Sequence, residues 1–311
     1  MKKRREINMK SKTVIGILLL VVFLGCSKQK ASMSQEIKVM SFNIWVGGGK
    51  SVAATAKVIE ESVADIIGIQ ESSRDDKNTA VIIADSMGWY SYATKGSPSI
   101  ISKYAIADTS SLGYGVKIQI DETRFVWMFN IHLLYCPYEP YQLNGIEYCG
   151  APLLLTAEEA VASAWNTRGE EVMRIISDIR KVQEEGFPVF LTGDFNEPSC
   201  RDWTDRAVAA GLCKTQIQWP ATNAFAKNAG MKDSYRDLYP DEVANPGHTW
   251  TSLPVADGAE EVMDRIDFVM YWGNIEPVKS LIIGEKGPVS DIIFEDYPSD
   301  HRAVITAFQL K

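Results

Sequence analysis

The sequence predicts a single domain of the α/β class, and three observations support this. Short apolar runs bounded by Pro, Gly and polar residues recur along the chain and are typical of buried strands, as in FPVFLTGDFNEP at 187–198. Segments with apolar residues at helical spacing, such as 170–182, stand between them. No internal repeat or low-complexity linker interrupts 36–311. Length alone allows one large domain or two small ones, so the unbroken pattern favours one domain over 36–311.

The elements follow from these patterns in chain order. Strands are predicted at 37–42, 65–70, 99–108, 113–120, 124–132, 189–191, 262–271 and 302–310. Helices are predicted at 51–64, 76–87, 156–185, 202–211 and 231–239. The segment 133–155, which is rich in Tyr and Pro, is predicted to be a long irregular loop, and loops of that length are usually functional or disordered.

The N-terminus predicts export. The first twelve residues are basic, and 13–25 form an apolar block too short to span a bilayer comfortably, which is the order of a secretory signal. The residues that end at Cys26 resemble a bacterial lipobox, in which the Cys is acylated, although Phe23 stands where such motifs usually carry Leu. We therefore predict a lipoprotein signal peptide at 1–25, a lipidated Cys26 that begins a polar linker at 26–35, and membrane anchoring at a bacterial cell envelope. An uncleaved membrane anchor is the alternative.

The net charge of the chain indicates which binding partners to expect. The formal net charge is −8, and beyond residue 25 the chain holds 26 Lys and Arg against 39 Asp and Glu. An acidic body argues against tight binding to a nucleic-acid backbone, which relies on Lys and Arg. Nucleic acid therefore stays a possible partner that is not favoured, because a nuclease can bind its substrate weakly. A monomer is expected.

Four cysteines follow Cys26, namely Cys136, Cys149, Cys200 and Cys213. Export permits disulfides, and four cysteines allow three pairings. A Cys136–Cys149 bridge would close the Tyr-rich segment and is the pairing we favour. A Cys200–Cys213 bridge would close a short helical segment and stays open, as does the alternative of four thiols.

Polar residues stand where the predicted strands end. After the strand at 189–191, Asp194 and Asn196 would share one side if the chain stayed extended. A carboxylate and a carboxamide there can hold a water or a phosphate oxygen beside a hard metal ion, although an Asx turn explains them equally well. Two of the only three histidines stand at such ends, which makes independent turn and capping roles for the whole set improbable. The set is Asn43, Glu71, His132, Asp194, Asn196, Asp267, Asp300 and His301.

The motifs around these residues resemble those of one superfamily. They are MSFNIW around Asn43, IGIQES around Glu71, SKYAI at 102–106, NIHL at 130–133, GDFNEPS at 193–199, DRIDFVMY at 264–271 and SDHRAV at 299–304. Their order is similar to that of the endonuclease/exonuclease/phosphatase (DNase I-like) superfamily, over about 36–311. The resemblance implies a four-layer α/β sandwich, with two mixed β-sheets face to face and helices outside.

The resemblance also implies a metal site. Glu71 would be the main carboxylate ligand of Mg²⁺ or Mn²⁺, with Asn43 close by and Asp300 approaching from the neighbouring position. A hard divalent ion prefers oxygen ligands of this kind and keeps waters for substrate.

The same resemblance implies the catalytic roles. His301 would activate the attacking water, and Asp267 would orient it through the other ring nitrogen. Asp194 and Asn196 would position the nucleophile and a phosphate oxygen, and His132 would donate to the phosphate. His248 is expected to be structural or substrate-lining, and Arg168 to lie on a solvated helix face.

Fold and machinery do not set the substrate, so three functions stay open. The first is a metal-dependent phosphoesterase acting on small or lipid-linked phosphate esters. The second is an exported nuclease that degrades DNA or RNA, and the third is an inactive binding lipoprotein. The tyrosines of 133–155 follow His132 directly and either wall the pocket or pack on the surface.

Overall fold

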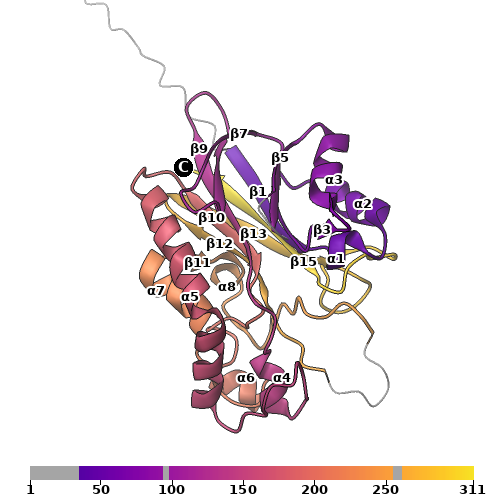
Figure 1. The fold of residues 1–311 in the computed structure, drawn as a ribbon, viewed down its shortest axis with the longest axis vertical. Coiled ribbons are helices and arrows are strands. Elements are labelled where there is room, and N and C mark those ends of the chain that lie inside the picture. The colour runs from indigo at the N-terminus through magenta and orange to yellow at the C-terminus, as the bar shows by residue number, and fades with distance from the viewer. Residues whose placement is uncertain (1–34, 94–97, 255–260) are drawn as a thin grey trace, which may run out of the picture. The chain divides into compact units, whose positions relative to one another are not determined.

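Two β-sheets packed face to face make the centre of the fold (Figure 1). The seven-stranded sheet has the order β14 (Ile292–Ile293), β13 (Ile275–Gly284), β15 (Ala303–Leu310), β1 (Gln35–Asn43), β2 (Ile66–Gln70), β6 (Ser99–Ser102), β5 (Tyr90–Ala93). The six-stranded sheet has the order β11 (Lys232–Asp233), β12 (Asp267–Trp272), β10 (Val189–Asp194), β9 (Phe125–His132), β8 (Gly115–Gln119), β7 (Ala105–Thr109). Strands β3 (Ser73–Arg74) and β4 (Lys77–Asn78) form a separate pair.

This computed structural model describes residues 35–93, 98–254 and 261–311. The predicted signal peptide, Cys26 and the linker up to residue 34 lie outside the described residues. Within them, no helix has the length and apolar character needed to cross a membrane. The helices are α1 (Trp45–Gly48), α2 (Val52–Ser62), α3 (Thr79–Met87), α4 (Glu139–Asn144), α5 (Ala157–Gln183), α6 (Asp205–Ala209), α7 (Pro220–Ala229) and α8 (Ser234–Leu238).

Helices cover the outer face of each sheet, which confirms the predicted four-layer sandwich. Helices α2 and α3 pack on the seven-stranded sheet through residues such as Ile59 and Ile83, and α5 and α7 pack on the six-stranded sheet through residues such as Ile175 and Phe225. Figure 1 shows the two helical layers on opposite sides of the strands.

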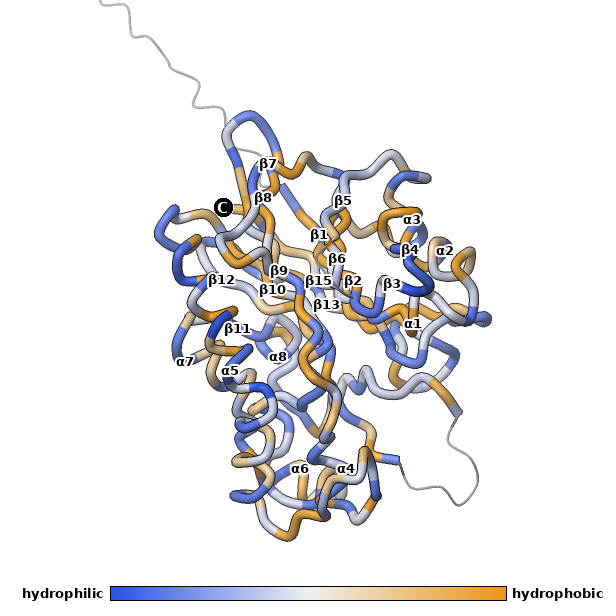
Figure 2. The backbone as a smooth tube through the Cα atoms, in the orientation of Figure 1, coloured by the Kyte–Doolittle hydropathy of each residue, from blue (hydrophilic) through white to orange (hydrophobic). Residues whose placement is uncertain are grey.

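Alternation along the strands builds these layers. In β1, Ile37 and Val39 point into the core between the sheets, whereas Met40 and Phe42 point to the core under α2 and α3. Successive strand residues face opposite sides, so a strand buried on both faces reads as a nearly continuous apolar run. Hydrophobic residues accordingly recur along the central strands in Figure 2.

One polar joint crosses the space between the sheets. The Asn130 amide nitrogen, on β9, donates to the backbone oxygens of Ile69 (3.0 Å) and Ser99 (2.8 Å) in the other sheet. Its amide oxygen accepts from Gln70 Nε2 at 2.5 Å and from Thr192 Oγ1 at 3.0 Å. All of these side chains are buried, so the joint satisfies polar groups that would be costly to leave unpaired.

Gly68 makes this close approach of the sheets possible. A Cβ atom at Gly68 would lie 2.0 Å from Thr192 Oγ1 and 2.5 Å from Asn130 Oδ1. Gly68 precedes Gln70 and Glu71, while Asn130 precedes His132, so the joint lies directly below the predicted functional residues.

Four element predictions were wrong in part. The predicted strand at 99–108 is two strands in different sheets, β6 and β7, because the chain leaves β6 at Ser102, whose hydroxyl accepts from Tyr104 N at 2.9 Å. The segment 133–155 contains α4, which has Pro140 as its second residue and ends at Gly145 with a left-handed φ of 83°. The strand predicted from 262 begins only at Asp267, and 231–239 opens with β11 before α8. The pattern analysis also missed α7 and β13.

Gly68→Ala is expected to lower the free energy of unfolding by about 1–3 kcal/mol, the usual effect of overpacking a filled core. Thr192 and Asn130 cannot move aside without losing buried hydrogen bonds. Thermal or urea unfolding measures the change. The matched control is Gly287→Ala, where the nearest atom to an added Cβ is Glu285 Oε1 at 3.6 Å, and there the change should stay within about 0.5 kcal/mol. Equal effects of the two substitutions would contradict a packing role for Gly68.

Candidate active site

Strand register brings the predicted residues together. Strands β9 and β10 run parallel with His132 opposite Asp194, and β12 runs antiparallel to β10 with Asp267 opposite Asp194. In the other sheet, β1 and β2 are parallel and pair Asn43 with Gln70, so Glu71 follows next to Asn43. Five predicted residues from two sheets therefore meet at one edge.

Asn43 joins the two sheets at this edge. Its Nδ2 donates to Asp194 Oδ2 at 3.0 Å and to Glu71 Oε1 at 3.1 Å. Its Oδ1 accepts from Trp45 N at 3.0 Å, so the amide nitrogen and not the oxygen faces the carboxylates. In this arrangement the amide nitrogen of Asn43 positions two acidic side chains, and its role as a metal ligand stays a prediction.

Glu71 is held in a constrained backbone conformation. Its φ is 53°, in the left-handed region, which costs a residue other than glycine about 1–3 kcal/mol and is often retained at functional sites. The loop after β1 clamps it, because Val46 N donates to Glu71 Oε2 (2.7 Å) and Gly47 N donates to the Glu71 backbone oxygen (2.6 Å).

His301 and Asp267 form a buried pair. His301 Nδ1 lies 2.9 Å from Asp267 Oδ2, and His301 Nε2 lies 3.6 Å from Asp194 Oδ2. The Trp250 ring packs on the imidazole with centroids 4.9 Å apart. Burial disfavours the imidazolium, but the charges of Asp267 and Asp194 outweigh it and raise the pKa of His301 well above its ordinary value.

His132 stands on the other side of Asp194. Its Nε2 lies 3.5 Å from Asp194 Oδ2 and 4.0 Å from Glu71 Oε1, and the side chain is 16% exposed. It is therefore both near the carboxylates and open to a ligand.

Asn196 lies in the turn that ends β10. Its φ of 47° shows that the chain does not stay extended after Asp194, so the two side chains are brought together by a turn and not by strand alternation. Asn196 N donates to Asp194 Oδ1 at 2.8 Å, and its Nδ2 donates to Leu133 O at 3.0 Å. It thereby fixes Asp194 and the chain that follows His132.

Asp300 adds a further carboxylate. Burial raises the pKa of Asp300, the adjacent His301 opposes this, and the negative charges of Glu71 and Asp194 raise it further. The preceding residue, Ser299, donates to the backbone oxygen of Asn43 at 2.6 Å and so ties this turn to β1.

The donor set fits a hard divalent cation. Glu71, Asp194 and Asp300 crowd like charges that a cation would relieve, and they offer oxygen ligands. Among the described residues, Asp194, Asp267 and His301 also place one ligand atom each within 4.8 Å of one another. We favour the first set, because Asp267 is already engaged by the His301 ring.

The sequence profile of the Endonuclease/Exonuclease/phosphatase family matches residues 40–301. The chain belongs to this family, whose members are hydrolytic phosphoesterases. An uncharacterized protein of Caenorhabditis elegans is 28% identical over 95% of this chain and 99% of its own length.

Solved structures of other proteins share the fold. A family protein from Bacteroides thetaiotaomicron has a TM-score of 0.55 at 14% identity, covering 89% of this chain and 96% of that one. The 3′ phosphatase NExo from Neisseria, bound to product DNA hairpin, has a TM-score of 0.54 at 15% identity, covering 87% and 98%. At these identities the likeness shows the fold alone.

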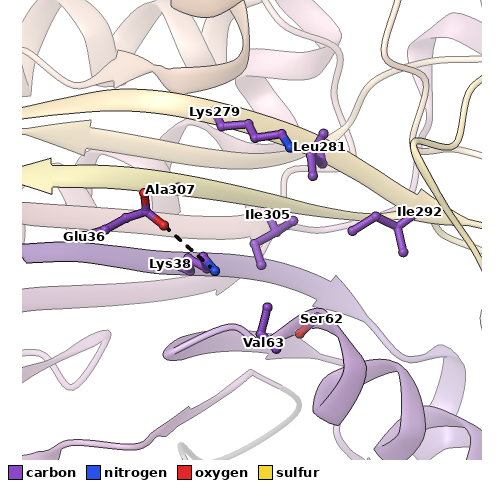
Figure 3. A pocket seen from close by; sticks show the side chains of 9 residues that line it. All are labelled: Glu36, Lys38, Ser62, Val63, Lys279, Leu281, Ile292, Ile305 and Ala307. Carbon is purple, nitrogen blue, oxygen red and sulfur yellow. Dashed lines mark ion pairs between the residues drawn. The ribbon is translucent and has the colours of Figure 1, made fainter.

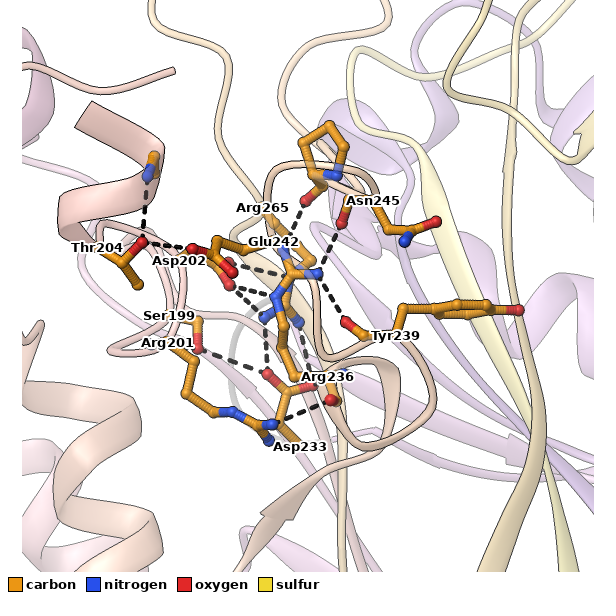
Figure 4. A network of polar contacts seen from close by, with 12 residues as sticks. Ser199, Arg201, Asp202, Thr204, Asp233, Arg236, Tyr239, Glu242, Asn245 and Arg265 are labelled. Carbon is orange, nitrogen blue, oxygen red and sulfur yellow. Dashed lines mark hydrogen bonds and ion pairs between the residues drawn. The ribbon is translucent and has the colours of Figure 1, made fainter. Parts of the chain in front are cut away.

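A buried ionic network holds the chain that follows the active-site turn (Figure 4). Arg265 pairs with Asp202 at 3.0 Å and with Asp233 at 2.7 Å, and Arg236 also reaches Asp202 at 2.6 Å. Arg265 stands two residues before Asp267, so the network fixes the start of β12.

Arg168 is buried and not solvated, so that prediction was wrong. It lies within α5, donates to the backbone oxygens of Leu134 (3.0 Å) and Pro137 (2.7 Å), and pairs with Glu139 at 2.9 Å. The predicted Cys136–Cys149 disulfide is confirmed, whereas Cys200 and Cys213 are free thiols. Arg168 and the disulfide together hold the chain after His132.

Cavities lie on two sides of the active site. One of about 560 Å³ reaches His132 and includes Tyr92, Tyr114 and Glu171 in its lining. Another of about 190 Å³ is lined by aromatic side chains and Asn196. A third of about 360 Å³, beside the end of α2, is lined by residues such as Lys38 and Leu281 and contains no residue of the active site (Figure 3).

The structure places two further residues, Trp250 and His248, relative to the active site. Trp250 was not singled out, because its contact with His301 joins residues 51 positions apart and no local pattern marks it. His248 lies away from the active site, and its backbone oxygen accepts from Arg302 at 3.0 Å. Burial is the main reason that the pKa of His248 is lowered to about 4.

NMR titration of the three imidazoles tests the electrostatics of the active site. In the metal-free protein, His301 should stay protonated as the pH rises through 6.5, the ordinary imidazole value, and lose its proton only well above it, because Asp267 and Asp194 stabilise the charged ring. Asp267→Asn removes the larger favourable charge and should lower this pKa, and Mg²⁺ should also lower it. His248 should remain neutral above about pH 4 in both proteins and serves as the internal control. A His301 pKa near 6.5 that Asp267→Asn leaves unchanged would refute the assignment.

Proposed function

We propose that this protein is a divalent-metal-dependent phosphoester hydrolase that acts on small or lipid-linked phosphate esters. The observation that carries the proposal is the meeting of the Glu71, Asp194 and Asp300 carboxylates with the buried His301–Asp267 pair. A histidine held by a carboxylate beside a cation-binding acidic set is the arrangement that activates water for attack on phosphorus.

Each residue of the active site has its own role in the proposed hydrolysis. His301 Nε2 takes a proton from the attacking water, while Asp267 at Nδ1 holds the ring and stabilises the imidazolium that forms. His132 donates to a phosphate oxygen, and Asn43 and Asn196 keep Glu71 and Asp194 in place. Glu71 and Asp300, with Asp194 beside them, would hold Mg²⁺ or Mn²⁺. When bound, the cation neutralises charge on the phosphoryl group and, by opposing the imidazolium, lowers the pKa of His301.

The surroundings favour small or lipid-linked esters over nucleic acid. The chain beyond residue 25 is acidic, and the aromatic cavity contains no Lys or Arg among its seven lining residues, all in the described part of the chain. A nuclease is the second candidate, because the fold is shared with a phosphatase that was solved with a DNA hairpin.

Hydrolysis of bis(p-nitrophenyl) phosphate and nicking of supercoiled plasmid, each with Mg²⁺, separate these functions. The ester should be hydrolysed, EDTA should abolish the activity, and His301→Ala should lower kcat by about 10²–10⁴-fold, the usual contribution of a general base. His248→Ala, which alters a histidine away from the active site, is the matched control. Plasmid nicking that EDTA and His301→Ala abolish would make the protein a nuclease. Inactivity towards every phosphoester would favour an inactive binding protein.

We further propose a lipid anchor at Cys26 and a place at the bacterial cell envelope. The basic and apolar order of 1–25 and the lipobox-like residues before Cys26 support this. Intact-mass analysis of protein from membrane fractions should show cleavage before Cys26 and added acyl mass, and Cys26→Ser should release the protein from membranes. An unmodified Cys26 in the membrane fraction would refute the anchor.

A further inference from the structure

Four tyrosines and Trp250 form a box of aromatic rings beside the active site. The cavity has a volume of about 190 Å³, below the usual range of pockets for drug-sized ligands, so it suits one small chemical group. It touches the active site through Asn196 and through Trp250, whose ring packs on His301. Its lining residues are Tyr135, Tyr138, Tyr141, Tyr148, Asn196, Trp250 and Ile266.

The rings stand at steep angles to one another. Tyr141 meets Tyr138 at 87° with centroids 4.8 Å apart, and meets Tyr148 at 87° with centroids 5.4 Å apart. Tyr135 meets Tyr148 at 67°. Walls at right angles enclose a compact group from several sides, whereas a flat base or a sugar ring is better held between or against parallel faces.

Two carboxyl groups stand behind the rings. Tyr138 donates its hydroxyl to Asp264 Oδ2 at 2.7 Å, and Tyr141 donates to Glu261 Oε1 at 2.7 Å. Trp250 Nε1 lies 3.2 Å from the same Glu261 oxygen. Three rings thus turn their polar atoms towards carboxyl groups, and the Glu261 carboxylate behind Tyr141 and Trp250 makes the box attractive to positive charge. Burial is the main reason that the pKa of Asp264, behind Tyr138, is raised to about 7.

The polar groups that line the box are partly engaged within the protein. The Nδ2 of Asn196, the one amide among the lining residues, already donates to Leu133 O. Lys and Arg are absent from these seven described residues, so a second phosphate group finds no counter-ion there. An inositol polyphosphate is therefore a poor match.

The box is also held in place before any ligand binds. The Cys136–Cys149 disulfide closes a loop that carries Tyr138, Tyr141 and Tyr148, and Tyr135 stands next to Cys136. Arg168 donates to the backbone oxygens of Leu134 and Pro137 on either side of this cysteine. Tyr138 is only 4% exposed. A site that is ordered in advance loses less entropy when it binds.

We propose that this aromatic box binds an organic cation, a quaternary or methylated ammonium group, carried by one arm of the phosphate ester. Aromatic faces attract such cations, and rings on several sides of a desolvated cation are the known way to recognise a quaternary ammonium. The assignment of this cation to the substrate rests on the proposed hydrolase function, but the binding itself does not.

Binding of choline and its neutral isostere 3,3-dimethylbutan-1-ol to the full chain in EDTA, by calorimetry, tests the box without catalysis. Choline should bind about tenfold or more tightly than the alcohol, the size expected of a cation–π site. Tyr148→Ala should weaken choline binding by about tenfold, and Tyr148→Phe should retain most of it, since the ring and not the hydroxyl carries the attraction. Tyr148 is 36% exposed, and thermal melts confirm folding of both variants.

A tyrosine outside the box provides the control for this experiment. Tyr90→Ala, at a tyrosine 51% exposed on β5 and outside the box, should leave choline binding unchanged. Equal binding of choline and the neutral alcohol, or a loss in Tyr148→Ala that Tyr148→Phe shares, would overturn the proposal.

Kinetics then separate this proposal from the proposed function. The ratio of kcat/KM for p-nitrophenyl phosphorylcholine to that for bis(p-nitrophenyl) phosphate should fall about tenfold in Tyr148→Ala, and a ratio that does not change would overturn the placement of the cation on the substrate. Hydrolysis of neither ester by the wild-type protein, together with selective choline binding, would refute the hydrolase while supporting the box.

Discussion

The close approach of the two sheets at Gly68 is the constraint on which the rest of the structure depends. Face-to-face sheets usually lie about 10 Å apart, with side chains filling the space. Here a missing side chain lets Asn130 of one sheet bond the backbone of the other. Since Glu71 stands just beyond Gly68 and His132 just beyond Asn130, this joint brings acidic and basic groups of separate sheets within reach of one another.

Asp194 is where these groups converge. It accepts from Asn43 of the other sheet and from the backbone of Asn196, and both active-site imidazoles lie within 3.6 Å of its Oδ2. Burying a carboxylate beside other carboxylates costs free energy unless positive charges nearby compensate it. The raised pKa of His301 shows that its imidazolium supplies part of this positive charge. A bound cation would supply it as well, so the cation and the His301 proton would compete at this centre.

Buried arginines give the loops around this centre their rigidity. Arg265 and Arg236 clamp the chain between β10 and β12, and Arg168 clamps the chain after His132. These ion pairs lie away from the reacting groups, so their contribution is to hold geometry. Arg168 supports the aromatic box in the same way, so the box and His132 are held by one shared loop.

The sequence by itself determined most of the strands and helices, because strand alternation and helical spacing are local. Its motifs, through their resemblance to one superfamily, predicted the four-layer sandwich and a set of polar residues at strand ends that register then brings together. Only the tertiary structure decided which way the Asn43 amide faces, that 99–108 divides between two sheets, and that Arg168 is buried. It alone assembled the aromatic box, whose walls join Trp250 to Tyr141 across 109 positions and Tyr138 to Asp264 across 126. Such contacts arise from the packing of distant segments, and no periodicity within a segment carries their signature.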